Sequence, residues 1–94
     1  QLPTVFGNPE FKKFIKLKKI IEISNFEFDK ISEFYFQKSK RWDIKTTNGV
    51  LIKFPRKNIQ EAISQTYDIL NSSQFSNMKT IDLRIEDQVI INDK

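Results

Sequence analysis

The Asn-Gly pair in the middle of this 94-residue chain constrains its fold more than any other feature. Residues 41–55 read RWDIKTTNGVLIKFP, so a run of alternating apolar and polar residues lies on each side of Asn48-Gly49. An Asn-Gly pair between two such runs is the strongest short-range signal for a β-hairpin. We therefore predict strands over residues 41–46 and 50–54, with Pro55 ending the second strand.

The register of this hairpin follows from the requirement that one of its faces be apolar. A two-residue loop mixes polar and apolar side chains on both faces. A three-residue loop over residues 47–49 separates them and puts Gly49 at the left-handed bulge position that such a loop requires. The predicted pairs are then Trp42 with Phe54, Ile44 with Ile52, Thr46 with Val50 and, on the other face, Asp43 with Lys53.

Residues 31–38, ISEFYFQK, predict a third antiparallel strand on the same apolar face. The same register logic pairs Phe36 with Trp42 and Phe34 with Ile44. Trp42 then lies in the middle of the apolar face, which predicts a core residue. Basic residues flank it in the sequence, so a surface that binds a polyanion stays open as a second interpretation.

Two amphipathic helices are predicted, over residues 9–23 and from residue 58 onward. Asn8 is the expected N-cap of the first helix, and Asn58 with Glu61 resembles a capping box at the start of the second. Residues that are apolar, or that pack readily in a core, recur in each helix at three- and four-residue spacing. They are Phe11, Phe14, Ile15, Leu17, Ile20 and Ile21 in the first helix, and Ile59, Ala62, Ile63, Thr66, Tyr67 and Leu70 in the second.

Two more strands are predicted after the second helix, which completes the order α, β, β, β, α, β, β. Ile81, Leu83 and Ile85 alternate with polar residues, a turn is expected at residues 86–87, and residues 88–92 form the last strand. The chain contains no repeat and no linker. We predict a single domain over residues 1–94 of the α+β class, with a largely antiparallel sheet of about five strands covered on one face by two helices.

The residue types exclude the commonest catalytic and metal sites. The chain has no Cys and no His, and therefore lacks a thiolate nucleophile, an imidazole base and strong zinc ligands. Asp43 and Asp82 are isolated acids, for which structural ion pairs are expected, Asp43 with Lys53 and Asp82 with a neighbour. We predict no enzyme activity, no cofactor and no metal site, and no apolar run is long enough to span a membrane.

The net charge of +4 suggests an alternative function as a nucleic-acid or anionic-membrane binder. Thirteen of the sixteen basic residues are Lys. Arg, not Lys, forms bidentate hydrogen bonds with phosphate, so we prefer the interpretation that these Lys side chains are simply solvated. The residues of the alternative site are Lys12, Lys13, Lys16, Lys19, Lys38, Lys40 and Arg41.

The last predicted strand carries three consecutive β-branched residues, Val89, Ile90 and Ile91, and no protective Lys or Pro. Such a run is either a central strand covered on both faces or an edge strand that accepts another chain. The residues alone do not decide between these two interpretations. In the second case, the expected mode of binding is β-strand addition.

Three segments of the chain resemble the periplasmic β-domain of the FtsQ/DivIB bacterial cell-division proteins. They are LPTVFG at the start, RWDIKTTNGVLIKFP in the middle and TIDLRIEDQVII at the end. That family has Leu-Pro with a Gly shortly after, then Arg-Trp and alternation up to Asn-Gly, then an amphipathic helix and Val-Asp-Leu-Arg. The order and spacing agree, and the resemblance covers essentially the whole chain.

The resemblance implies a non-enzymatic scaffold of the divisome at the septum, on the periplasmic side of the inner membrane. Family members carry a cytoplasmic tail, one membrane span and a POTRA domain before this domain, so the chain is similar to the distal C-terminal part. The family binds the small single-span proteins FtsB and FtsL, chiefly by pairing an FtsB segment with the last strand. FtsB-like and FtsL-like partners are therefore implied, with no nucleic acid and no small-molecule substrate.

The partner-binding residues implied by the resemblance lie at the end of the chain. They are Arg84, Ile85, Gln88, Val89, Ile90, Ile91 and Asn92. Arg84 stands where the family's Arg contacts an acidic residue of the partner. The chain departs from the family at Ile85, where an aromatic residue is familiar, at about Asp93, where a second aromatic is usual, and at Phe54-Pro55, which replaces Leu-Pro.

Overall fold

The predicted hairpin forms the middle of a six-stranded sheet in the computed structural model, which describes residues 3–72, 77–85 and 88–92. Its two strands are β3 (Trp42–Thr46) and β4 (Leu51–Lys53). The other elements are β1 (Thr4–Phe6), α1 (Phe11–Ile23), the 3₁₀ turn η1 (Phe28–Lys30), β2 (Ile31–Phe36), α2 (Ile59–Leu70), β5 (Thr80–Asp82) and β6 (Ile90–Asn92).

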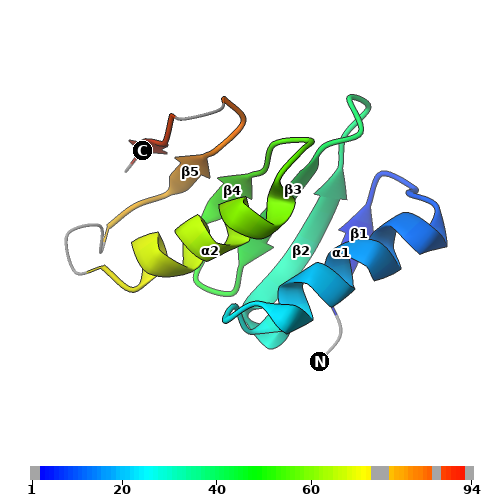
Figure 1. Cartoon of the computed structure of the whole chain (residues 1–94), viewed down its shortest axis with the longest axis horizontal. Coiled ribbons are helices and arrows are strands. Elements are labelled where there is room, and N and C mark those ends of the chain that lie inside the picture. Colours follow the sequence, from blue (N-terminus) through cyan, green and yellow to red (C-terminus); the bar gives the residue numbers. More distant parts are fainter. Residues whose placement is uncertain (1–2, 73–76, 86–87, 93–94) are drawn as a thin grey trace.

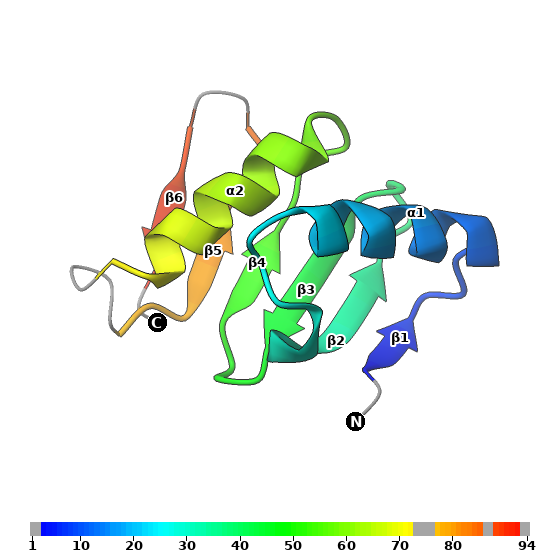
Figure 2. The same ribbon diagram turned by 60° about the horizontal axis from the view of Figure 1, so that its bottom comes forward.

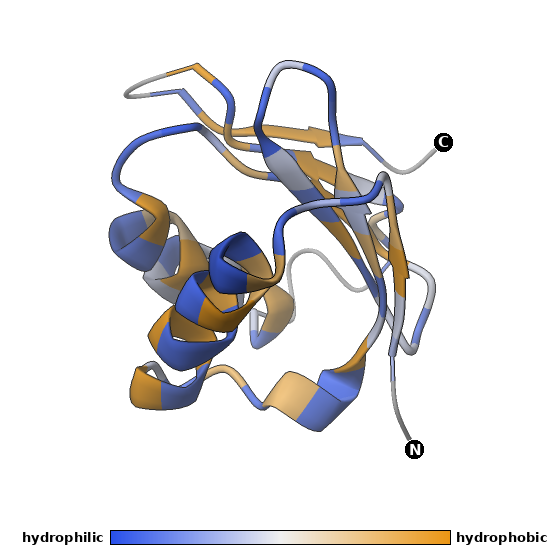
Figure 3. Ribbon diagram, turned by 90° about the vertical axis from the view of Figure 1, so that its right-hand side faces the viewer, coloured by the Kyte–Doolittle hydropathy of each residue, from blue (hydrophilic) through white to orange (hydrophobic). Residues whose placement is uncertain are grey.

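The strands lie side by side in chain order, from β1 at one edge to β6 at the other. The β1–β2 and β4–β5 pairs are parallel, and the other three pairs are antiparallel. Both long helices cover the same face of the sheet (Figures 1 and 3). The α+β class, the two layers and the largely antiparallel sheet are thus confirmed, with six strands in place of about five.

The register of the central strands is the predicted one. Asp43 is opposite Lys53 and Ile44 is opposite Ile52, while Phe36 and Phe34 pair with Trp42 and Ile44. At the ends of the hairpin, the amide of Phe54 donates to the carbonyl of Trp42 and the amide of Thr46 donates to that of Val50. Gly49 has φ 86°, the left-handed conformation expected of it.

The core is built on the apolar face of these strands. Trp42 is only 5 % exposed, which is the core position that the hairpin register predicts. Its ring contacts those of Phe34 and Phe36 on β2 and that of Phe14 on α1, with ring centroids 4.9 to 6.2 Å apart. Ile44, Ile52 and Phe54 are buried beside it. The basic residues of the hairpin are left outside this cluster.

Strand β1 was not predicted, and it changes the order of elements to β, α, β, β, β, α, β, β. Its three residues pair in parallel with β2, so α1 is the crossover of a β-α-β unit. A three-residue strand is too short to show an alternating pattern, and its partner lies about 29 residues further along the chain. Sequence periodicity therefore gave no signal for it.

The N-cap predicted at Asn8 is wrong, whereas Asn58 lies at the predicted N-cap position of α2 but does not cap it with its side chain. Asn8 and Asn58 both have left-handed backbone conformations, with φ 50° and 59°. Helix α1 begins at Phe11 with Glu10 at the N-cap position, and neither helix has a side-chain cap hydrogen bond. Asn tolerates the left-handed region better than most residues, which explains why the same residue type marks both sites.

Replacing Trp42 by Ala is expected to lower the free energy of unfolding by about 3 to 5 kcal/mol, because the cavity would open in the middle of the aromatic cluster. Urea denaturation measures the loss. Phe11→Ala is the matched control, since that aromatic ring is 75 % exposed and its removal leaves no cavity. Equal losses in the two variants would contradict the core role of Trp42.

Gly7→Ala is expected to destabilise the protein more than Gly49→Ala does. Both residues have positive φ, 96° and 86°, so both variants carry a backbone cost of about 1 to 2 kcal/mol. A Cβ at Gly7 would also overlap the carbonyl oxygen of Phe36, whereas a Cβ at Gly49 would meet open space. The difference between the two unfolding free energies, measured in urea, isolates this overlap. It should be on the order of 1 to 3 kcal/mol, and no difference would mean that β1 is not held against β2.

Candidate functional site

Strand β6 is an edge strand. In the part of the chain that the structure describes, it pairs with β5 alone, with Thr80 opposite Asn92, Ile81 opposite Ile91 and Asp82 opposite Ile90. Figure 2 shows it beside β5 at the end of the sheet, with its other side uncovered by any drawn element. Of the two readings that the residues left open, the edge strand is the one the structure adopts.

Within the part of the chain that the structure describes, the backbone of β6 presents unpaired groups to the open side. The carbonyl of Asn92 accepts a hydrogen bond from the amide of Lys79, 2.6 Å away, so Asn92 is turned toward β5. The backbone groups of successive strand residues point to opposite sides. Ile90 is therefore also turned toward β5, and the amide and carbonyl of Ile91 face the open edge.

The side chains around β6 are unusually apolar for an edge. Ile90 is 40 % exposed and Val89 is 41 % exposed. Ile85, three residues after the end of β5, is 58 % exposed. Residues 88–92 contain no Lys and no Pro, the residues that commonly protect an open edge. The predicted site residues Gln88 and Asn92 lie on the same segment, and four of the set, Arg84, Ile85, Gln88 and Val89, line one groove. The expected turn at residues 86–87 lies outside the described residues.

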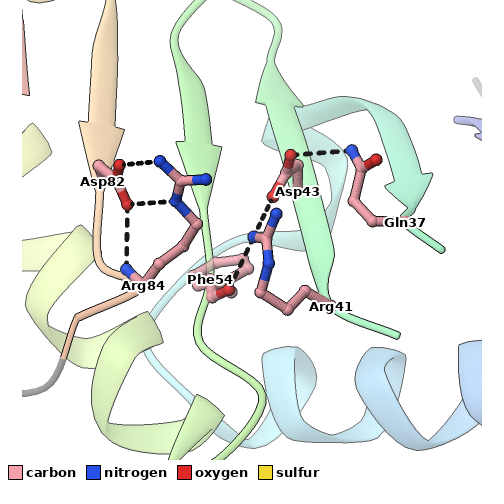
Figure 4. A network of polar contacts seen from close by, with 6 residues as sticks. All are labelled: Gln37, Arg41, Asp43, Phe54, Asp82 and Arg84. Carbon is pink, nitrogen blue, oxygen red and sulfur yellow. Dashed lines mark hydrogen bonds and ion pairs between the residues drawn. The ribbon is translucent and has the colours of Figure 1, made fainter. Parts of the chain in front are cut away.

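Arg84 is engaged within the chain. Its Nε and Nη2 donate to the two carboxylate oxygens of Asp82, at 2.9 and 2.6 Å, and its backbone amide donates to the same carboxylate at 3.0 Å (Figure 4). These hydrogen bonds hold the pKa of Asp82 below its ordinary value of 3.8. They also raise the pKa of Arg84. The pair is the predicted ion pair of Asp82 with a neighbour, and it orients a guanidinium whose side chain is 43 % exposed.

The predicted ion pair of Asp43 with Lys53 is wrong, because Asp43 pairs with Arg41. An Nη1–Oδ1 distance of 3.0 Å joins the two, and Gln37 donates to the other carboxylate oxygen at 2.9 Å. The same Arg41 nitrogen donates to the carbonyl of Phe54 at 3.2 Å (Figure 4). A guanidinium can serve a carboxylate and a carbonyl together, which the Lys ammonium directly across the strands cannot match.

A groove of about 470 Å³ lies between the start of α2 and the β5–β6 segment. Its apolar lining comes from Pro55, Ala62, Leu83, Ile85 and Val89, and its polar lining from Arg41, Arg56, Lys57, Asn58, Glu61, Gln65, Arg84 and Gln88. Sequence analysis missed Arg56 and Lys57 as members of a site. They follow Pro55 directly, and the parallel pairing of β4 with β5 brings them into the groove that Arg84 also lines.

The cations of the alternative basic site differ in how free they are to bind an anion. Lys12, Lys13, Lys16 and Lys19 are exposed on α1, and Lys38 and Lys40 are exposed in the β2–β3 turn. Arg41 is instead half-buried and held by Asp43, so the one guanidinium in this set is not free to bind phosphate. Among residues 3–72, 77–85 and 88–92, no group of His, Cys, Asp or Glu side chains could hold a metal ion.

The chain resembles known cell-division proteins. The family model described as "Cell division protein FtsQ/DivIB, C-terminal" matches residues 1–84. A curated relative, "Cell division protein FtsQ" of Rhizobium meliloti (strain 1021), is 32 % identical over 54 residues, which cover 55 % of this chain and only 18 % of that protein. The family match ends before β6, and no described helix is long and apolar enough to cross a membrane.

Arg84→Gln is expected to raise the pKa of Asp82 toward 3.8, because glutamine cannot supply the charged two-point contact. The depressed pKa means that the ionised carboxylate stabilises the folded chain above pH 3.8 and that this contribution is lost as the pH falls through the folded-state value. The stability difference between wild type and variant should therefore be greatest at neutral pH and shrink in acid.

A carbon NMR titration of the Asp82 carboxyl, combined with urea denaturation at neutral and acidic pH, measures both effects. Arg56→Gln is the control, since Arg56 is exposed and forms no ion pair among the described residues. An unchanged Asp82 pKa in Arg84→Gln would contradict the assigned pair.

Proposed function

The chain belongs to the FtsQ/DivIB C-terminal family of cell division proteins, and on this premise we propose that it is a non-enzymatic interaction module of the bacterial division complex. Its partners are small single-span division proteins of the FtsB and FtsL type. The FtsB-like partner adds a strand to the open edge of β6. The parent protein acts at the division septum, on the periplasmic side of the inner membrane.

The observation that carries this proposal is the open edge of β6. The outward-facing amide and carbonyl of Ile91 are a ready template for another strand, and main-chain hydrogen bonds supply the affinity in this mode of binding. Each bond contributes about 0.5 to 1.5 kcal/mol net, so several are needed. The strand at the opposite edge, β1, is equally short.

The exposed side chains favour β6 over β1 as the docking edge. Ile90 is exposed on β6, and the exposed Val89 next to it lines one groove with the exposed Ile85. At the other edge, Phe6 is already stacked on Tyr35, with ring centroids 5.0 Å apart. Apolar residues that have no internal partner supply both area and specificity to an added strand.

The test is the pair of variants Ile91→Pro and Ile91→Ala. Proline removes the outward-facing amide and is compatible with an edge strand, whereas Ala removes only the side chain. Binding of a synthetic peptide from the periplasmic segment of the same organism's FtsB-like protein, measured by calorimetry, should be weakened about tenfold or more by Pro relative to Ala. Equal affinities for the two variants would refute strand addition at β6.

Amide NMR during the same titration locates the contact. We expect shifts over residues 80–92, unchanged binding in Val5→Lys on the β1 edge, and weakened binding in Ile90→Lys. Val5 and Ile90 are exposed to similar extents, 38 % and 40 %, so the two substitutions are matched. Shifts confined to α1, with binding that disappears steeply with salt, would instead support the basic-surface alternative.

A further inference from the structure

We infer that the groove beside β6 is a second anchor for the added segment and that it binds an acidic side chain through Arg56 and Lys57. This inference rests on the proposed function and extends it to the chemistry of the partner. The strand that pairs with β6 would carry a carboxylate, beside an apolar residue, at the end that lies nearest Val89. The apolar residue enters the groove and the carboxylate meets the two cations at its rim.

The charges of the groove single out these two residues. Four cations line it, and the only acid among its described lining residues is Glu61. Arg41 and Arg84 are already neutralised by Asp43 and Asp82 at ion-pair distances of 3.0 and 2.6 Å. Arg56 and Lys57 are exposed and form no ion pair among residues 3–72, 77–85 and 88–92. The uncompensated positive charge therefore lies at the Pro55 end of the groove.

The groove is continuous with the docking edge. Gln88 and Val89 lead directly into β6 and also line the groove, as does Ile85. Leu83 and Ala62 are buried and make its floor apolar. A segment that leaves the β6 edge on the Val89 side therefore enters a groove that offers it both apolar surface and the two cations. This arrangement suits an apolar residue next to an acidic one, and a purely basic or purely polar segment would be disfavoured there.

The resemblance implies that Arg84 contacts an acidic residue of the partner, but Asp82 competes for the same guanidinium. A guanidinium that donates two hydrogen bonds to Asp82 has fewer donors left for a partner carboxylate. Its exposed part can still add to the positive potential of the groove. Arg56 and Lys57 have all their donors free of ion pairs in the described structure, so they can bind a partner's carboxylate without first losing an internal contact.

A double-mutant cycle tests the inference. One side of the cycle is Arg56→Gln with Lys57→Gln, and the other is the FtsB-like peptide with its acidic residues changed to the corresponding amides. At low salt, each change alone should raise the Kd about three- to tenfold, and the second change should add little once the first is present. In about 1 M NaCl, where the Debye length is about 3 Å, the effects should largely vanish.

Lys12→Gln with Lys16→Gln is the matched control, since it removes the same charge from the exposed side of α1 and should leave the Kd nearly unchanged. Independent, additive losses in the cycle, or an equal loss in the control, would overturn the inference while β6 shifts continued to support strand addition. Absence of β6 shifts with the wild-type chain would overturn the proposed function and, with it, the second anchor.

Discussion

Packing of the aromatic face of β2 and β3 against α1 is the interaction on which the rest of the molecule depends. Phe34 and Trp42 lie side by side in the sheet, and Phe14 reaches both of them from the helix, with ring centroids 5.2 and 6.2 Å away. This contact fixes which face of the sheet is covered. Because β-strand side chains alternate, it also fixes which residues point into solvent. The polar pairs of Figure 4 are a consequence of that choice, because Asp43 and Asp82 alternate along their strands with the buried Ile44 and Ile81.

The two edges of the sheet have different physical characters, although both strands have three residues. β1 is secured by close backbone approach at Gly7, by parallel pairing with β2 and by the stacked rings of Phe6 and Tyr35. Among the described residues, β6 pairs with β5 alone, and Ile90 and Val89 are exposed to about the same extent as Val5 and Phe6 of β1. Exposed apolar side chains next to unpaired backbone groups are costly in an isolated chain, because they invite unspecific association. A partner strand would satisfy both.

Most of the fold could be predicted from the sequence because its strongest signals are local. The turn at Asn48-Gly49 and the alternation on each side of it determine the register of three strands, from Phe36 to Phe54. The parts that could not be predicted depend on distant strand pairing or on local side-chain and backbone geometry. Strand β1 has no pattern of its own, and Arg41 displaces Lys53 as the partner of Asp43 because of a side-chain geometry that spacing does not encode. Asn8 resembles an N-cap in the sequence but lies two residues before the actual one, Glu10, and the left-handed backbone of Asn58 is not encoded in the capping pattern.

Only part of the candidate site could be predicted from the sequence, because only that part is contiguous in the chain. Its apolar run, from Val89 to Ile91, is contiguous, and its Asp-Leu-Arg segment precedes it closely. Arg56 and Lys57 lie more than 25 residues earlier, and they reach the site because the parallel β4–β5 pair places Lys53 beside Asp82. Strand addition alone can accept many sequences, since backbone groups are common to all of them. A charged groove at one end of the strand restricts the orientation and the composition of the segment, so selectivity would come from the part of the site that only the fold brings together.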